Sequence, residues 1–62
     1  MSELKQYYNP DKYNKGWRYV VWVGGCDDYY KSRKDAQHAY DGWIAQGYTD
    51  VQIERIEKDE LA

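Results

Sequence analysis

The segment WRYVVWV at residues 17–23 limits the folds open to this chain more tightly than any other stretch. It consists almost wholly of β-branched and aromatic residues, which predicts a β-strand. Successive side chains of a strand point to opposite faces. One face of this strand would carry Trp17, Tyr19, Val21 and Val23. The other would carry Arg18, Val20 and Trp22. Apolar side chains on both faces predict a central strand.

The size of the chain restricts how a core can be built around that strand. Sixty-two residues allow one small domain, and such a domain buries only about 60% of the surface that its unfolded chain exposes. Eight tyrosines and three tryptophans supply much of the apolar surface, and phenylalanine is absent. Cys26 is the single cysteine, which excludes an intrachain disulfide. With one histidine besides, we expect neither a structural metal nor a cofactor.

The residues after the strand predict a hairpin and then a helix. Gly24-Gly25 suits a tight turn, and a second strand within residues 26–31 would place Tyr29 and Tyr30 on opposite faces. Ser32 is a good N-cap for the helix, with Asp35 three residues later. Gly47 is a natural helix end.

An apolar stripe at helical spacing follows Ser32 and would face the sheet. It comprises Ala36, Ala39, Tyr40, Trp43 and Ile44. Gly42 lies inside this helix, where it costs about 1 kcal/mol relative to alanine; close packing against a strand would explain it. A last strand is predicted over residues 51–57. We expect the core to contain Ala36, Tyr40, Trp43, Val51 and Ile53.

These elements predict an α+β fold of the ββαβ type. A right-handed crossover places the last strand beside the first, which gives a three-stranded antiparallel sheet of order 2-1-3 with one helix on one face. The predicted domain covers residues 17–57. It is preceded by a polar, tyrosine-bearing N-terminal arm at residues 1–16 and followed by a polar C-terminal tail at residues 58–62. Within the arm, Asn9-Pro10-Asp11 predicts a turn.

A single helix would leave the second face of the sheet open. We expect that face to show Val20 and Trp22, together with Ile56 and one of Tyr29 or Tyr30. The alternation leaves open which face of the central strand meets the helix, and either choice exposes a tryptophan or a tyrosine-rich face. Two alternatives remain for what covers it. Either the arm folds back through Tyr7, Tyr8 or Tyr13, or the face binds another protein or a second copy of the chain.

Aromatic and arginine side chains are enriched in protein-binding hot spots. The sequence therefore predicts a protein-binding surface made by Trp22, Val20, Arg18, Tyr29 and Tyr30. A self-assembling structural protein that forms a homodimer, for example through an edge strand, is another alternative.

Nucleic-acid binding is the alternative prediction. Lys31, Arg33 and Lys34 cluster at the start of the helix, where backbone N–H groups favour phosphate. A net charge of −2 argues against this function. So do four neighbouring carboxylates, those of Asp27, Asp28, Asp35 and Asp41.

No sequence feature predicts an enzyme or a membrane protein. Cys26 and His38 could be read as a nucleophile and its base, but no third group that would orient the base is evident. The longest apolar run, residues 19–23, is far shorter than the ~20 residues needed to span a bilayer. The N-terminus lacks the apolar core of a signal peptide. A single free cysteine fits a reducing compartment, so we expect a cytosolic protein.

The order of elements from Trp17 to Ile56 resembles that of small phage-encoded accessory proteins. In these proteins a strand and hairpin precede a helix similar to SRKDAQHAYDGWIAQGY and a last strand similar to TDVQIERI. Phage inhibitors of host RNA polymerase include chains of this size and plan. The resemblance covers about two-thirds of the chain and lies in pattern, so it transfers no functional residue. It implies a non-enzymatic protein that binds and modulates a host enzyme.

Overall fold

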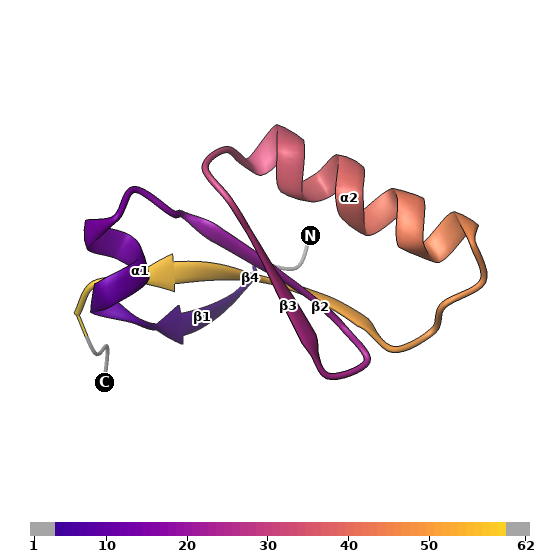
Figure 1. The fold of residues 1–62 in the computed structure, drawn as a ribbon, viewed down its shortest axis with the longest axis horizontal. Helices are drawn as coiled ribbons and strands as arrows, with labels where there is room; N and C mark the ends of the chain where they lie inside the picture. Colours follow the sequence, from indigo (N-terminus) through magenta and orange to yellow (C-terminus); the bar gives the residue numbers. More distant parts are fainter. Residues whose placement is uncertain (1–3, 60–62) are drawn as a thin grey trace.

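The fold is a small α+β arrangement, and the computed structural model describes residues 4–59 of the chain. One sheet holds four strands, and two helices accompany it (Figure 1). In chain order the elements are β1 (Lys5–Tyr8), α1 (Pro10–Asn14), β2 (Tyr19–Val23), β3 (Cys26–Tyr30), α2 (Arg33–Ala45) and β4 (Val51–Glu57). The predicted fold class is therefore confirmed.

Strand β2 lies inside the sheet, as its two apolar faces indicate. It pairs antiparallel with both β3 and β4. Val21 on β2 lies opposite Asp28 on one side and Ile53 on the other. These three strands have the order expected from a right-handed crossover.

The predicted count of three strands and one helix is wrong, because the residues before β2 add a strand and a helix. β1 pairs parallel with the outer edge of β4, with Tyr7 opposite Ile56, and completes the sheet order β1-β4-β2-β3. A strand of four residues is too short to show a reliable alternation in sequence. Its position depends on the free edge that β4 offers, which is a tertiary feature.

Helix α1 occupies the place where a turn was predicted. Asn9 is its N-cap, and the side-chain oxygen of Asn9 accepts a hydrogen bond from the backbone N–H of Lys12 at 3.2 Å. Pro10 follows at the start of the helix, where its missing N–H costs nothing. Asn, Pro and Asp favour both turns and helix starts, so their presence alone did not distinguish the two.

The β2–β3 hairpin has a two-residue loop, because Val23 pairs with Cys26. Of its two glycines, Gly24 alone has a positive φ, of +64°. A positive φ at the first loop position only is the pattern of type II′ turns, whose twist matches that of the flanking strands. The predicted tight hairpin is thus present.

Helix α2 begins and ends where the sequence predicts. The Ser32 hydroxyl oxygen accepts a hydrogen bond from the backbone N–H of Asp35 at 3.2 Å. At the other end Gly47 has φ +99°, and the Tyr48 N–H donates to the Trp43 carbonyl at 3.2 Å. The Tyr48 ring meets the Trp43 ring edge-to-face at 5.3 Å. This combination of bond and apolar contact is a Schellman motif.

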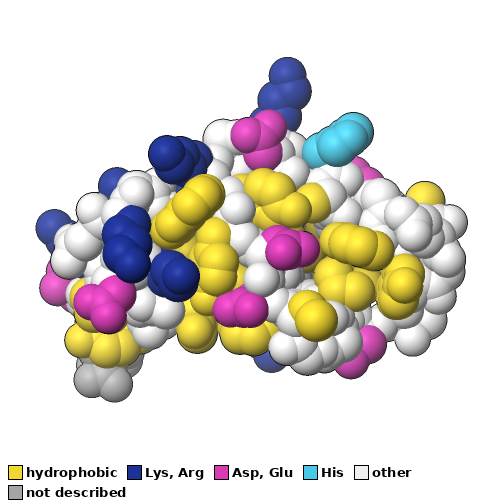
Figure 2. All heavy atoms as spheres, viewed as in Figure 1, with side chains coloured by type: hydrophobic (Ala, Val, Ile, Leu, Met, Phe, Trp, Pro, Cys, Tyr) yellow, Lys and Arg dark blue, Asp and Glu magenta, His cyan; other side chains and the backbone are white. Residues whose placement is uncertain are grey.

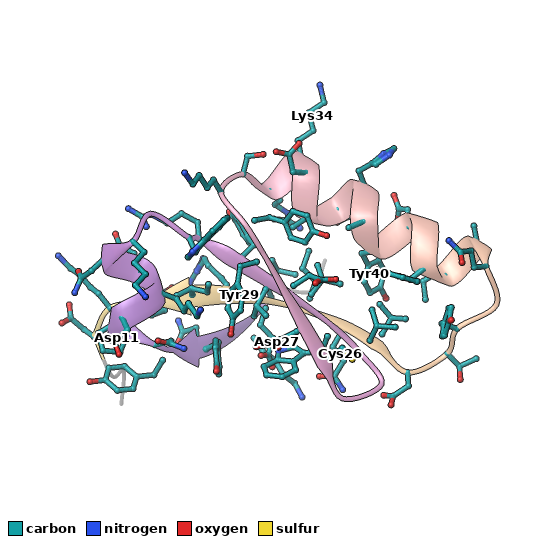
Figure 3. All side chains as sticks on the ribbon, viewed as in Figure 1. Asp11, Cys26, Asp27, Tyr29, Lys34 and Tyr40 are labelled. Atoms are coloured by element: carbon teal, nitrogen blue, oxygen red, sulfur yellow. The ribbon has the colours of Figure 1, made fainter. Side chains whose placement is uncertain are left out.

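The main core lies between α2 and the sheet. Val21, Ala36 and Val51 are buried there, and Figure 3 shows Tyr40 between the helix and the strands. Half-buried side chains surround them: Tyr19, Val23, Tyr30, Tyr40, Trp43 and Ile53. All five residues predicted for the core are among these buried and half-buried side chains.

Two expectations for α2 are corrected. Ile44, predicted to lie in the apolar stripe, is 43% exposed because it lies at the end of the helix beyond the packed stripe. At Gly42, a Cβ atom would meet no other atom within 4 Å. Close packing therefore does not explain this glycine.

Candidate functional site

The structure decides which face of β2 meets the helix. Val21 packs against α2, so the alternation of the strand directs Val20 and Trp22 to the opposite, second face. Ile56 shares this second face. Val20 is 0% exposed and Ile56 1%, which shows that much of the second face is covered by the chain itself.

The segment before β2 provides that cover. The Tyr7 ring of β1 meets the Trp22 ring edge-to-face, with centroids 5.6 Å apart. The Arg18 guanidinium carbon lies 3.7 Å from the centroid of the Tyr13 ring, and Arg18 also donates to the Tyr13 carbonyl at 2.9 Å. Folding back of the N-terminal residues, one of the two alternatives above, therefore occurs through Tyr7 and Tyr13.

Three of the five residues predicted for protein binding are not available in the way expected. Val20 is buried beneath its neighbours. Tyr30 faces the opposite way, into the core under α2. Arg18 is engaged within the chain, where it joins α1 to the sheet. Trp22 and Tyr29 remain half-exposed on the second face.

Beside Trp22 the second face is hollowed. The cavity has a volume of about 430 Å³ and is lined by Tyr7, Trp22, Gly24, Asp50, Gln52 and Glu54. We call it the Trp22 hollow.

Backbone and side-chain hydrogen bonds fix two sides of the Trp22 hollow. The Trp22 indole N–H donates to a carboxylate oxygen of Glu54 at 2.8 Å. The Gly24 N–H donates to the Asp50 carbonyl at 2.9 Å, which ties the hairpin turn to the start of β4. The hollow thus has a held indole, the carboxylate of Glu54, a second acidic residue in Asp50, and one exposed amide residue, Gln52.

Gln52 and Glu54 share one face of β4 by alternation, but neither was among the residues predicted for a binding site. Assigning Gln52 to a site with Trp22 would have required the register of β4 against β2, because the two residues lie opposite each other only in that register. Tyr7 and Asp50 were also missed as parts of a site. Nothing in the local sequence marks them, because both reach the hollow through tertiary contacts.

Tyr29 lies in a second group of side chains, further toward α1 on the same face. Its hydroxyl donates to the Asp27 carboxylate at 2.6 Å, and the two side chains project from β3 in Figure 3. Burial raises the pKa of Tyr29 above its ordinary value, and the bond to Asp27 and the nearby Tyr7 raise it further. Tyr29 is therefore held in its neutral form.

At this end of the molecule, side-chain cations lie over aromatic rings. We call these cations and rings together the basic–aromatic cluster. The Lys12 ammonium lies 4.5 Å from the centroid of Tyr29, and the Lys31 ammonium lies 5.3 Å from that of Trp17. Figure 2 shows Lys and Arg side chains gathered over α1 and the start of α2. The members of the basic–aromatic cluster are Lys12, Tyr13, Trp17, Arg18, Tyr29, Lys31 and Lys58.

The three residues predicted for nucleic-acid binding are not one group. Lys31 belongs to the basic–aromatic cluster. Arg33 and Lys34 are exposed in the first turn of α2, and Lys34 extends away from the molecule (Figure 3). The structure therefore divides the predicted patch.

Cys26 and His38 lie on different elements, β3 and α2, and both are exposed. No hydrogen bond joins them within residues 4–59. Among the described residues, no group of three or more His, Cys, Asp or Glu side chains could hold a metal ion. Within the same residues, no helix has the length and apolar character required to cross a membrane.

Comparison with family models, with curated proteins and with solved structures gave no significant match.

Proposed function

We propose that this chain is a small, non-enzymatic protein-binding module whose contact surface is the Trp22 hollow and its rim. The observation that carries the proposal is the half-exposed Trp22 in a concavity of about 430 Å³ on the sheet face opposite α2. Tryptophan is among the residues most enriched in binding hot spots. A concave surface with aromatic walls and a few placed polar groups is the usual form of a recognition site.

The mechanism would be occupation of a partner's surface. Tyr7 and Glu54 hold the Trp22 side chain in place, so binding would cost little side-chain entropy. A rigid anchor of this kind suits a regulator or inhibitor that blocks or redirects its partner. We extend the proposal to a phage-type regulator of a host protein on the basis of the resemblance in element order. The single free cysteine favours action in the cytosol.

The test compares four forms of the tagged protein in affinity capture from a bacterial lysate. They are wild type, Trp22→Ala, Gln52→Arg, which fills the hollow, and Gln46→Arg, which adds the same charge at the exposed end of α2. We expect a protein retained by wild type and by Gln46→Arg to be lost from the other two. Circular dichroism melts report whether each variant still folds.

Equal retention by all four forms would contradict the proposal. If Trp22→Ala does not unfold cooperatively, Trp22 is needed for the fold. Gln52→Arg then carries the test, because Gln52 is exposed and its replacement removes no packed group.

The basic–aromatic cluster supports nucleic-acid binding as the second candidate. Its cations, however, lie over rings of the same chain, so those ring faces are not free to stack on bases. A nucleic-acid binder would be retained on single-stranded DNA or RNA at low salt and released steeply as salt rises. Absence of retention at low salt would end this alternative.

A further inference from the structure

Two aromatic rings form adjoining walls of the Trp22 hollow. The planes of Tyr7 and Trp22 are perpendicular, at 90°, with centroids 5.6 Å apart. The face of an aromatic ring carries negative electrostatic potential, which attracts a cation placed over it. The hollow therefore has walls that favour a positively charged ligand.

The charged groups of the hollow favour the same ligand. Asp50 and Glu54 line it, and none of the lining residues that the structure describes is a Lys or Arg. One oxygen of Glu54 accepts the Trp22 indole N–H, which leaves the second oxygen for another donor. Two acidic residues, with no Lys or Arg among the described lining residues, attract a cation and repel phosphate or another anion.

The cations nearest to β4 in sequence and register do not neutralise these carboxylates. Lys5 lies opposite Glu54 in the β1–β4 register, but it is exposed and forms no ion pair within 4 Å with any residue from 4 to 59. Arg55 projects to the other face of β4, where its Nε lies 2.6 Å from a Glu57 oxygen. The charge of the hollow is thus open to an external cation.

From these observations we infer that the Trp22 hollow binds the guanidinium group of an arginine in a basic segment of the partner protein. The inference rests on the proposed function, because it specifies the partner's chemistry at the same surface. A guanidinium group is planar, so it can stack on an aromatic face while its N–H groups donate to carboxylates. Gln52 adds an amide oxygen as a further acceptor at the exposed rim.

The experiment is an NMR titration of the full-length, nitrogen-15-labelled chain. The probe is the peptide acetyl-Gly-Arg-Gly-amide, and the control peptide replaces arginine with citrulline, which has nearly the same shape without the charge. Each is added up to about 20 mM, a range suited to weak single-residue binding. The signal followed is the Trp22 indole N–H, assigned from its loss in Trp22→Phe.

We expect the arginine peptide to shift the Trp22 indole signal toward saturation, with an affinity about tenfold above that of the citrulline peptide. Glu54→Gln and Asp50→Asn should each weaken arginine binding about threefold, the usual effect of losing one partly exposed charge partner. Asp41→Asn removes an exposed carboxylate on α2, away from the hollow, and should leave the affinity unchanged.

The inference is overturned if both peptides shift the indole signal equally, or if arginine shifts only signals outside the hollow. Lys5→Gln adds a further measurement. An unchanged or raised affinity for arginine supports the inference, because a raised affinity means that Lys5 itself competes for the hollow. A loss of binding in Lys5→Gln contradicts it, since removal of a cation cannot weaken a site that attracts cations.

The two proposals can fail separately. If lysate capture depends on Trp22 and Gln52 while arginine and citrulline peptides bind alike, the protein-binding module stands and the arginine specificity falls. If arginine binds selectively while capture is the same for all four forms, the hollow still recognises a guanidinium group. The protein-binding module then falls, and with it the assignment of that arginine to a partner protein.

Discussion

Tyr29 illustrates how the fold changes the chemistry of a single residue. In sequence it is one of eight tyrosines. In the structure its hydroxyl bonds Asp27 at 2.6 Å, and burial together with this bond raises its pKa. Tyr30 faces the other way, and burial, followed by the charges of Asp28 and Asp35, raises its pKa as well.

These raised pKa values make stability sensitive to alkaline pH. An unfolded tyrosine ionises near pH 10, whereas folded Tyr29 and Tyr30 keep their protons above that value. Above about pH 10 the unfolded chain therefore binds fewer protons than the folded one, and the free energy of unfolding falls as pH rises. The stabilisation is complete below about pH 10 and is lost as pH climbs toward the folded pKa values.

Urea unfolding between about pH 8 and pH 11 measures this dependence. We expect Tyr29→Phe to flatten the alkaline fall, since phenylalanine has no proton to lose. Tyr8→Phe is the control, because Tyr8 is 53% exposed, and it should keep the wild-type slope. A slope unchanged by Tyr29→Phe would show that Tyr29 ionises alike in both states.

At the scale of elements, β1 is the part that completes the second face. It has four residues and pairs with β4 alone, so its own hydrogen bonds give it little stability. Tyr7 packs on Trp22, while Tyr8, on the other face of the strand, is 53% exposed. We conclude that the contact of Tyr7 with Trp22 contributes strongly to holding this strand in place.

The pair of variants Tyr7→Ala and Tyr8→Ala tests this conclusion. Tyr7→Ala removes a half-buried ring and should lower the free energy of unfolding by about 2 kcal/mol. Tyr8→Ala should change it by less than about 0.5 kcal/mol. Urea denaturation gives both values; equal losses would show that β1 is held by its backbone pairing rather than by Tyr7.

Helix α2 contains a weak point at Gly42. This glycine lies in mid-helix with open space around it, so Gly42→Ala should raise the free energy of unfolding by about 0.5–1 kcal/mol. Gly47→Ala makes the same chemical change where φ is +99° and should lower it by about 1 kcal/mol. Thermal melts of the two variants should therefore shift in opposite directions.

A destabilised Gly42→Ala variant would contradict the open space seen at this position. A stabilised Gly42→Ala variant would show that the fold itself does not require this glycine. A partner contact with the exposed side of α2 would be the remaining reason for a glycine there.

For the whole molecule, the distribution of exposed apolar groups bears on self-association. The large apolar side chains exposed within residues 4–59 are Tyr8, Ile44 and Tyr48. Ile44 and Tyr48 lie at the end of α2, whereas Tyr8 lies on an edge strand. They form no single broad apolar face of the kind that stable homodimers bury.

We therefore expect a monomer of 7.5 kDa at micromolar concentration. Light scattering behind size exclusion measures the mass directly. A dimer would contradict this expectation and would favour the homodimer considered from the sequence. Tyr8→Lys, which places a charge on the β1 edge, would then show whether the dimer forms through that edge.

Much of the central fold could be predicted because its signals are local. Alternation identified β2 and β4, and capping residues identified both ends of α2. The order of β3, β2 and β4 followed from the handedness of the crossover. The alternation also grouped Val20 with Trp22 on one face of β2, although it left open which face meets α2.

The N-terminal elements and the rest of the site could not be predicted in the same way. Residues that favour a turn formed α1, and a four-residue segment became β1 only because it meets β4, far along the chain. That pairing placed Tyr7 on Trp22 and helped to bury Val20 and Ile56. The predicted surface residue Val20 was thereby moved into the interior.

By itself, then, the sequence determined the elements whose hydrogen bonds and apolar periodicity act over a few neighbouring residues. The tertiary structure alone decided which face of β2 is covered by α2, which residues cover the other, and that Tyr7, Asp50 and Glu54 meet around Trp22. The physical reason is that strand pairing between distant segments is governed by the free edges and apolar faces that the assembled sheet presents. Those edges and faces exist only once the chain has folded.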